Sequence, residues 1–315
     1  MTDIAIVGAG VMGANHGRVA QAVRELTVAV VCDPDADRAS ALAGSLGAKS
    51  TTDLDEALSN AEAVILATPS HTHAELGERA LRAGRDLLVE KPIATTVADA
   101  ERLIEAARAN DRVLMIGHVE RFNPVIAELV ELVEDPIHLE ITRVGPFSNR
   151  LLADVVLDLM IHDIDLARAI AGTTIVEHHA MTQVVRSGEE DLACALLRFE
   201  NGVIANVTAS RISQNKVRRI VVTQRENAIV VDLLRQHIEI HRIEHSEYLS
   251  DGGVRYRQSG LVEIPFLSHH GEPLLRELRH FAQCVQDRST PIVTGADGLA
   301  ALRVCLDIRD SAVTG

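Results

Sequence analysis

The chain has 315 residues, a formal net charge of -14 and 47% hydrophobic residues, with five Phe, two Tyr and no Trp. This length favours two domains, and the composition gives them largely aliphatic cores. The negative charge argues against nucleic acid and anionic membranes as partners, and the shortage of aromatic residues argues against base-stacking surfaces.

The cysteines and the N-terminus indicate where the protein resides. Four cysteines are widely separated and lack C-x-x-C spacing: Cys32, Cys194, Cys284 and Cys305. This spacing is typical of free thiols in a reducing compartment. Asp3 and Gly8 interrupt the first apolar run, so neither a signal peptide nor a membrane span is expected. The sequence therefore predicts a cytoplasmic protein.

Short apolar runs alternate with helix-period segments over residues 1–120. The strand candidates are residues 4–7, 28–32, 63–67, 87–89 and 113–116. The helix candidates between them are residues 12–23, 35–46, 72–83 and 96–109. Such alternation implies parallel strands with right-handed helical crossovers. Residues 1–120 are predicted to form a doubly wound α/β domain.

The pattern changes after Asn123-Pro124. A helix over 124–133, a strand over 137–144 and a helix over 154–171 come first. Strand candidates without intervening helices follow: 175–185, 191–199, 203–209, 216–223, 227–231 and 236–243. Asn201-Gly202 is typical of a two-residue hairpin turn, and helices over 272–287 and 295–311 close the chain. Residues 121–315 are predicted to form an α+β domain with one broad, mainly antiparallel sheet, whose open face is covered by self-association.

A glycine motif joins the first strand candidate to the first helix candidate. Its residues are the first candidates for cofactor binding: Gly8, Gly10, Val11, Met12 and Gly13. In a dinucleotide fingerprint the first glycine permits a tight turn, the second admits the pyrophosphate and the third allows close helix–strand packing. The helix N-terminus supplies amide donors for the phosphates. A tight turn without a ligand is the alternative.

Asp33 ends the second strand candidate, about 20 residues after the motif, as the fingerprint requires. Its carboxylate can accept hydrogen bonds from both ribose hydroxyls. A 2′-phosphate would instead meet Asp33, Asp35 and Asp37, with only Arg38 to compensate. NAD is therefore favoured over NADP. A turn role before Pro34 is the alternative for Asp33.

Two further loops lie at the carboxyl ends of predicted strands, where ligands bind in open α/β sheets. In the first, Thr68 and Pro69 are expected to face the nicotinamide ribose and His71 the rim of the cofactor or substrate, while His73 has either a structural or a functional role. The second is Glu90-Lys91-Pro92. A lysine there suggests hydride chemistry on an alcohol, because it can stabilise charge on oxygen. A surface salt bridge is the alternative.

A second polar cluster lies on the helix candidate over 154–171. Asp158 and His162 are four residues apart and share a helix face. Histidine exchanges protons near neutral pH, and a carboxylate beside it could orient the imidazole. A solvated helix face is one alternative and a metal site another, but the two ligands of D-x-x-x-H have no obvious third, so no metal is predicted.

Arginines near the domain junction are candidates for binding an anionic substrate. Arg121 and Asn123 belong to Arg-Phe-Asn-Pro, and Arg150 precedes the helix with the second polar cluster. Arginine binds anions through charge-assisted hydrogen bonds. The basic residues at 216–219 are interpreted instead as a solvated sheet face.

Together these motifs resemble the family named after glucose-fructose oxidoreductase, inositol dehydrogenase and a rhizopine-catabolism protein (Gfo/Idh/MocA). The residues that carry the resemblance are the glycine motif, Thr68-Pro69, His73, Glu90-Lys91-Pro92, Asp158, His162 and Glu272-Pro273-Leu274. The resemblance implies a Rossmann domain, an open-faced antiparallel sheet domain, dimers or tetramers, and a catalytic trio at Lys91, Asp158 and His162. Family members commonly have Asp-x-Gly-x-His, whereas this chain has Met160 in place of the glycine, which leaves substrate packing there open.

A narrower resemblance, to UDP-N-acetylglucosamine 3-dehydrogenase-like members, rests on residues 117–124, 144–150 and 157–165. It implies NAD-dependent oxidation of a ring hydroxyl on a sugar or nucleotide sugar, with a diphosphate held by Arg121 and Arg150. Three alternatives stay open: a dehydrogenase for inositol or another sugar, an NAD-dependent glycosidase, and a non-catalytic NAD sensor. The expected assembly is a homodimer or homotetramer formed through the C-terminal sheet.

Overall fold

The computed structural model describes residues 1–147, 154–250, 253–267 and 270–314. The chain divides into two compact units, one of Met1–Phe122 with Gly271–Arg303 and one of Asn123–His270 with Val304–Gly315. The first boundary lies close to residue 120, but residues 271–303 group with the first unit rather than with the domain predicted over 121–315. They do so because helix α8 (Pro273–Asp287) packs on α1 and β1, burying Leu278 and Phe281.

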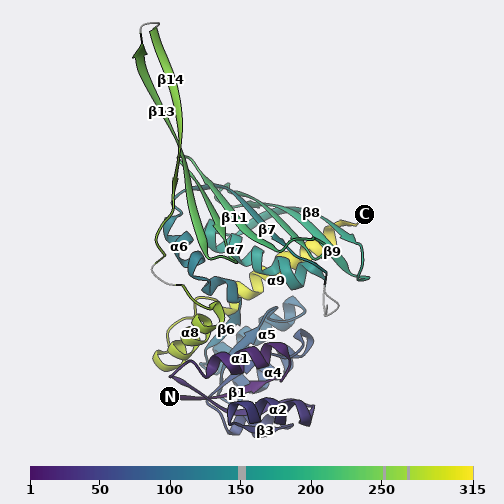
Figure 1. Ribbon diagram of the computed structural model, residues 1–315. Helices are drawn as coiled ribbons and strands as arrows, with labels where there is room; N and C mark the ends of the chain where they lie inside the picture. Colours follow the sequence, from purple (N-terminus) through teal and green to yellow (C-terminus); the bar gives the residue numbers. More distant parts are fainter. Residues whose placement is uncertain (148–153, 251–252, 268–269, 315) are drawn as a thin grey trace. The chain divides into compact units, whose positions relative to one another are not determined.

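The first unit contains a six-stranded parallel sheet (Figure 1). Its strands are β1 (Thr2–Val7), β2 (Leu26–Cys32), β3 (Lys49–Thr51), β4 (Ala63–Leu66), β5 (Asp86–Glu90) and β6 (Leu114–Gly117). Their order is β3-β2-β1-β4-β5-β6. Successive strands are therefore added in one direction from β1 to β3 and in the opposite direction from β4 to β6. That reversal is the switch point at which such sheets bind ligands. The predicted Rossmann sheet is confirmed.

Helices connect these strands as expected for a doubly wound sheet. They are α1 (Val11–Ala20), α2 (Ala36–Leu46), α3 (Leu54–Ser59), α4 (His73–Arg82) and α5 (Val97–Ala109), with short 3₁₀ turns η1 (Ser70–Thr72) and η2 (Val119–Phe122). Helix α1 packs beside α2 and α8, and α4 packs beside α5. Side-chain caps begin α2 and α5, where Asp35 and Thr96 accept backbone N–H bonds that the first helical turn leaves open. The short elements β3 and α3 were not predicted, because three and six residues are too few to establish a period.

The second unit is built on a nine-stranded, mainly antiparallel sheet. Its elements are α6 (Pro124–Leu132), β7 (Pro136–Val144), a π-turn η3 (Val156–Met160), α7 (Ile161–Ala171), β8 (Ile175–Val184), β9 (Glu190–Phe199), β10 (Ile204–Ser210), β11 (Val217–Gln224), β12 (Ala228–Asp232), β13 (His237–Ser250), β14 (Gly253–Glu263) and β15 (Val313–Thr314). The strand order is β14-β13-β12-β11-β7-β10-β9-β8-β15. Helix α9 (Gly295–Ser311) contains the unit boundary at Arg303.

One face of this sheet is buried and the other is open. Along β9 the buried residues Ala193, Ala195 and Leu197 alternate with the exposed Cys194 and Leu196. Helix α7 packs against β7 and β10 on the buried side. The predicted open-faced sheet is therefore confirmed.

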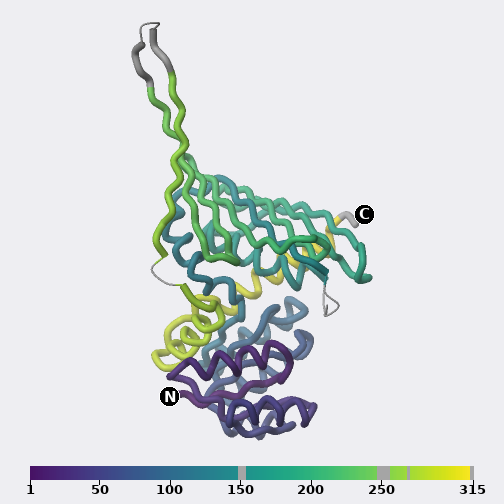
Figure 2. The backbone as a smooth tube through the Cα atoms, viewed as in Figure 1, coloured from purple at the N-terminus to yellow at the C-terminus, as the bar shows by residue number. Residues whose placement is uncertain are grey.

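Strands β13 and β14 form a hairpin that continues beyond the rest of the sheet (Figure 2). Strand β12 pairs only with the beginning of β13, up to His241, whereas β13 and β14 pair as far as Ser250 and Gly253. The sequence predicted a strand only over 236–243. The remainder was missed because its apolar residues are sparse and glycines interrupt it.

Candidate active site

The glycine motif forms a turn that leaves room for a ligand at one position only. Gly8 has a φ of +100°, and a Cβ there would lie 2.4 Å from the carbonyl oxygen of Ala67. A Cβ on Gly13 would lie 1.8 Å from the carbonyl oxygen of Gly8. A Cβ on Gly10 would meet no atom within 4 Å. The first and third glycines therefore serve backbone packing, while the second faces open space, as binding of a pyrophosphate requires.

The N-terminus of α1 is left ready for an anion. Gly10 is its N-cap and supplies no side-chain hydrogen bond, and the first turn carries no acidic residue. The amides of Val11, Met12 and Gly13 occupy this turn, where a helix has no carbonyl partners for its N–H groups. A phosphate accepts such bonds and is favoured by the positive end of the helix dipole.

Asp33 lies at the end of β2 and is fixed to the glycine turn. Its Oδ2 accepts a hydrogen bond from the amide of Ala9 at 2.7 Å, and its Oδ1 accepts one from the amide of Asp35 at 2.9 Å. Carboxylate oxygens keep further lone pairs, so Asp33 can still accept bonds from a ribose. Burial, with the negative charges of Asp33 and Asp53, raises the pKa of the adjacent Cys32 thiol to about 11. The residues present fit NAD.

The loop after β4 is tied to the loop after β5 by a buried histidine. The ring nitrogens of His73 lie 2.9 Å from the carbonyl oxygens of Thr68 and Pro92. Burial lowers the pKa of His73 against the opposing effect of these two contacts. The arrangement favours the structural alternative for His73. The Thr68 hydroxyl lies 2.7 Å from that of Thr72, and His71 is exposed.

Glu90 ends β5 with its carboxylate directed into the first unit. Its Oε1 lies 2.7 Å from Nε2 of His16, and its Oε2 accepts a hydrogen bond from the backbone amide of Lys91 at 3.3 Å. Glu90 is buried, so the surface salt bridge considered from the sequence does not describe it. Lys91 itself is partly exposed at the carboxyl edge of the sheet, and the Lys91–Pro92 peptide bond is cis.

His16 was not predicted from the sequence. It lies on α1, three residues after the last glycine of the motif, and its side chain is fully buried. A single histidine inside a helical pattern carries no signal of its own. The only clue was its place on the helix that follows the fingerprint.

In the second unit, Asp158 and His162 lie on one helical segment, which begins as a π-turn and continues as an α-helix. Asp158 belongs to the π-turn η3 and His162 to the first turn of α7. Both are partly exposed, whereas Met160 and Ile161 between them are buried. Single π-turns within helices are frequent at functional sites. The predicted regular helix over 154–171 thus differs from the observed one at the turn that holds Asp158.

Two other carboxylates of this cluster stabilise the fold. Asp154 caps the segment, because its Oδ1 accepts hydrogen bonds from the amides of Val156 and Leu157, both at 2.9 Å. Asp163 pairs with Arg143 of β7, with Nε 2.9 Å from Oδ1, and both side chains are buried. These contacts give Asp154 and Asp163 structural roles.

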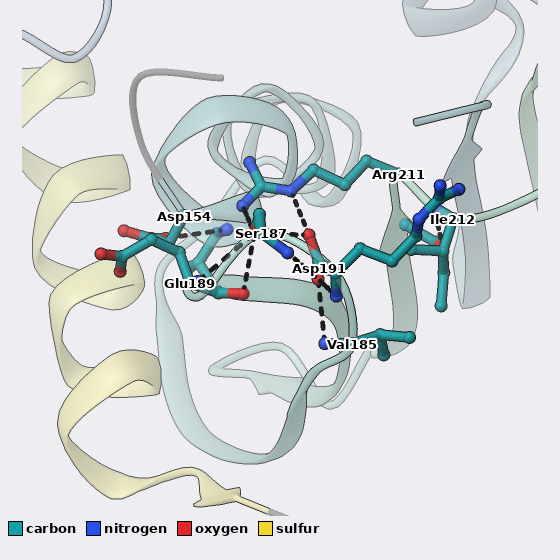
Figure 3. A network of polar contacts seen from close by, with 10 residues as sticks. Asp154, Val185, Ser187, Glu189, Asp191, Arg211 and Ile212 are labelled. Carbon is teal, nitrogen blue, oxygen red and sulfur yellow. Dashed lines mark hydrogen bonds and ion pairs between the residues drawn. The ribbon is translucent and has the colours of Figure 1, made fainter. Parts of the chain in front are cut away.

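A buried network closes the turn between β8 and β9 (Figure 3). The Nε of Arg211 lies 2.8 Å from Oδ1 of Asp191, which also accepts a bond from the Ser187 hydroxyl at 2.7 Å. The other oxygen accepts three backbone amides, from residues 185–187. Burial alone would raise the pKa of Asp191, but the hydrogen bonds from Ser187, the Arg186 amide and Arg211 lower it well below its usual range. The network is structural and was not predicted.

The predicted substrate residues differ in their surroundings. Arg121 lies on η2 and donates to the carbonyl of Ile292 at 3.4 Å. Asn123 is buried, where its Oδ1 accepts the amide of Val125 at the start of α6 and its Nδ2 donates to the carbonyl of Leu233 at 3.1 Å. These bonds give Asn123 a structural role. Arg150 lies outside the described residues.

Within the described residues, no group of three or more His, Cys, Asp or Glu side chains is arranged to hold a metal ion. In that same part of the chain, none of the helices combines the length and apolar character needed to cross a membrane.

Comparison with known proteins identifies the family. A family model described as "Oxidoreductase family, NAD-binding Rossmann fold" matches residues 2–118, and one described as "GFO/IDH/MocA C-terminal domain" matches residues 147–230. UDP-N-acetylglucosamine 3-dehydrogenase from Acidithiobacillus ferrooxidans is 30% identical over 96% of this chain and 95% of that protein. A crystal form of that enzyme superimposes with a TM-score of 0.88 at 29% identity, covering 99% of this chain and 97% of the other.

Myo-inositol 2-dehydrogenase from Thermotoga maritima is 28% identical over 95% of this chain and 92% of that protein. These similarities span both units and include the nucleotide-binding turn described above. The chain therefore belongs to the Gfo/Idh/MocA family of NAD-dependent oxidoreductases, whose members include sugar dehydrogenases.

Proposed function

We propose that this protein oxidises a secondary ring hydroxyl of a nucleotide sugar, and that UDP-N-acetylglucosamine or a close relative is its substrate. The observation that carries the proposal is Lys91, a partly exposed cation at the carboxyl end of β5 in an NAD-binding sheet. A simple nucleotide-binding protein has no need of a cation there. Similarity along nearly the whole chain to UDP-N-acetylglucosamine 3-dehydrogenase supports the substrate class.

Bound NAD supplies the hydride acceptor. The amides of Val11, Met12 and Gly13 would hold its pyrophosphate and Asp33 its adenosine ribose, while Thr68, Pro69, His71 and Glu90 would line the remainder of the NAD site. Lys91 donates a hydrogen bond from Nζ to the reacting hydroxyl oxygen and stabilises the negative charge that develops on it. The imidazole of His162 accepts the hydroxyl proton, and Asp158 orients that imidazole. The π-turn that holds Asp158 supports this assignment.

The diphosphate of a nucleotide sugar needs positive groups in a chain whose net charge is -14. We assign this binding to Arg121 and Arg150, because guanidinium groups form paired, charge-assisted bonds with phosphate. Asn123 is left out of this set because its amide is used in the fold.

An inositol dehydrogenase is the second candidate, supported by 28% identity to myo-inositol 2-dehydrogenase. It needs no diphosphate-binding arginines, so substitution of Arg121 separates the two candidates. Arg121→Ala should raise KM for a UDP-sugar substrate and leave KM for an inositol substrate unchanged.

The test is a panel of UDP-sugars and inositols incubated with NAD, followed by NADH absorbance and by mass spectrometry of the ketone. A 2-oxoacid acceptor is included so that turnover on a tightly retained cofactor is also seen. Formation of a 3-keto UDP-sugar supports the proposal. Release of an aglycone without net NADH would indicate a glycosidase, and NAD binding without any product would indicate a sensor; either result overturns the proposal.

The open face of the nine-stranded sheet supports self-association, as predicted from the sequence. Met181, Leu196 and Ile204 expose apolar side chains on neighbouring strands of this face. We propose a homodimer or homotetramer that covers it, because large exposed apolar areas mark association sites. Light scattering of the purified protein tests this, and Leu196→Glu should shift the mass towards the monomer.

A further inference from the structure

The carboxylate of Glu90 joins the first helix of the nucleotide-binding domain to the residue proposed for catalysis. One oxygen binds Nε2 of His16 on α1 at 2.7 Å, and the other accepts the backbone amide of Lys91 at 3.3 Å. The chain positions 16 and 91 are thus connected by one buried side chain. Lys91 directly follows the last residue of β5. The hydrogen bond from its amide to Glu90 therefore restrains the backbone from which the Lys91 side chain extends.

Space for this carboxylate is provided by Gly117 at the end of the neighbouring strand β6. A Cβ at that position would lie 3.2 Å from both Cα and Oε2 of Glu90. The side chain is therefore enclosed between α1 and β6. An enclosed carboxylate keeps one orientation only if its oxygens have fixed donors.

The surroundings of Glu90 favour the ionised form of its carboxylate. Burial alone would raise its pKa, but the hydrogen bond and charge of His16, with a smaller contribution from Lys91, lower it. His16 is thus the strongest of the groups that stabilise the anion. The side chain of His16 is completely buried, and burial of a polar ring is unfavourable unless the ring forms a hydrogen bond.

A second buried carboxyl group lies close enough to interact with Glu90 without replacing His16. Among the residues that the structure describes, neither oxygen of Glu277 on α8 has a hydrogen-bond partner, although the side chain is fully buried. Burial, with the negative charge of Glu90, raises the pKa of Glu277 well above its usual range. Burial and the Glu90 charge therefore favour the protonated form of Glu277.

We propose that His16 is a positioning residue for Lys91, and that it acts through the Glu90 carboxylate. The inference rests on the proposed role of Lys91 in hydride transfer. A residue needed only for packing of α1 could be aliphatic, as Val19 is three residues later on the same helix. The hydrogen bond distinguishes His16 from such a residue.

The first experiment compares His16→Leu with His16→Gln. Leucine fills most of the space but cannot donate a hydrogen bond, whereas glutamine keeps an N–H donor. His16→Leu should lower kcat at least tenfold while the Kd for NAD, measured by calorimetry, changes less than twofold. His16→Gln should recover most of kcat. Val19→Ala is the matched control, since it disturbs the packing of the same helix and should leave kcat within twofold of wild type.

A double-mutant cycle tests whether the effect passes through Glu90. His16→Leu is combined with Glu90→Ala, which removes the carboxylate. If His16 acts through Glu90, the second substitution adds little to the first, because the two residues operate as one unit. Multiplication of the two losses would overturn the proposed route.

Hydrogen–deuterium exchange gives a measurement that does not depend on activity. The amide of Lys91 is bonded to Glu90 in the wild type, so it should exchange faster in His16→Leu but not in Val19→Ala, with fragmentation used to isolate this amide. Unchanged exchange and unchanged kcat in His16→Leu would overturn the positioning role while leaving a dehydrogenase intact. A wild type that oxidises no compound of the panel would overturn the proposed function, and the exchange of the Lys91 amide would still decide the role of His16.

Discussion

The amide of Ala9 donates a hydrogen bond of 2.7 Å to Asp33, so the acidic residue after β2 is attached directly to the glycine turn after β1. This hydrogen bond joins the two parts of the dinucleotide fingerprint, which are 24 residues apart in the sequence. Substitution of Asp33 therefore affects both the ribose site and the turn that faces the pyrophosphate.

Asp33→Ala should weaken NAD binding by about 1.5–3 kcal/mol, because hydrogen bonds to a charged group are lost. Binding of NADP should suffer less, since a carboxylate that repels the 2′-phosphate is removed. The ratio of kcat/KM for NAD to that for NADP therefore falls. Steady-state kinetics with both cofactors measures it, and a wild-type enzyme that already prefers NADP would contradict the assignment.

Gly13→Ala is predicted to act mainly on stability and Gly10→Ala mainly on NAD binding. At Gly13 the new methyl group would lie 1.8 Å from a carbonyl oxygen, so the free energy of unfolding should fall by about 3 kcal/mol or more. At Gly10 the backbone is extended and the methyl group meets no atom within 4 Å, so stability should change by less than about 0.5 kcal/mol.

Gly10→Ala should instead weaken NAD binding, because the methyl group fills the space that the pyrophosphate needs. Denaturant unfolding and calorimetric NAD titration test the pair. Equal stability losses in the two variants would contradict this division of roles.

Lys91→Met should lower kcat by orders of magnitude and leave the Kd for NAD nearly unchanged. Methionine keeps the length of the side chain but removes the cation that stabilises charge on the reacting oxygen. Stopped-flow measurement of NADH formation, with calorimetry for NAD, separates the two effects. Wild-type activity in this variant would refute the assignment of Lys91.

Glu277→Gln should stabilise the protein more at alkaline than at acidic pH. The pKa of Glu277 is raised in the folded state, so its contribution to stability is complete below the unfolded pKa of about 4.3 and is lost as the pH rises towards the folded pKa. Glutamine has no titrating proton, so the Glu277→Gln variant does not lose this stability as the pH rises. Urea unfolding of both proteins at pH 5 and pH 8 measures the difference, which should be larger at pH 8.

Asp191→Asn should destabilise the second unit by about 3–5 kcal/mol, because it leaves Arg211 buried without its counter-charge. The pKa of Asp191 is lowered in the folded state, so its contribution is present above the unfolded pKa of about 3.9 and is lost as the pH falls. The matched control is Asp55→Asn, which breaks an exposed ion pair with Arg79 and should change stability by less than about 1 kcal/mol. Urea unfolding near neutral pH compares the two.

Periodicity was sufficient for the architecture where apolar residues repeat regularly. The strands over residues 4–7 and 87–89 and the long helices were predicted close to their observed bounds, because buried strands need continuous Val, Ile or Leu. It failed for β3, whose three residues are polar and exposed or half-buried, and for most of the β13–β14 hairpin. It also gave no sign that residues 271–303 return to the first unit, since that depends on which apolar faces meet in space.

The sequence pointed to candidate site residues only where they belong to short local motifs. The glycine turn and Asp33 have a spacing with a direct physical meaning, and the structure explains each glycine separately. His16 could not be found in this way, because its partner Glu90 is 74 residues away. Asn123 was predicted to contact the substrate from its place beside Arg121, and the sequence did not show that its Oδ1 also caps α6. The roles of Lys91, Asp158 and His162 stay predictions.

The return of residues 271–303 to the first unit has a consequence for synthesis of the protein. When Phe122 leaves the ribosome, all six strands of the nucleotide-binding sheet are present, but α8 is still about 150 residues away. A nascent first unit would therefore expose the surfaces of α1 and β1 that Leu278 and Phe281 later cover. Although the NAD-binding sequence is translated first, its domain is completed almost last. A gene truncated after residue 122 would encode every residue predicted to contact the nucleotide but would lack α8.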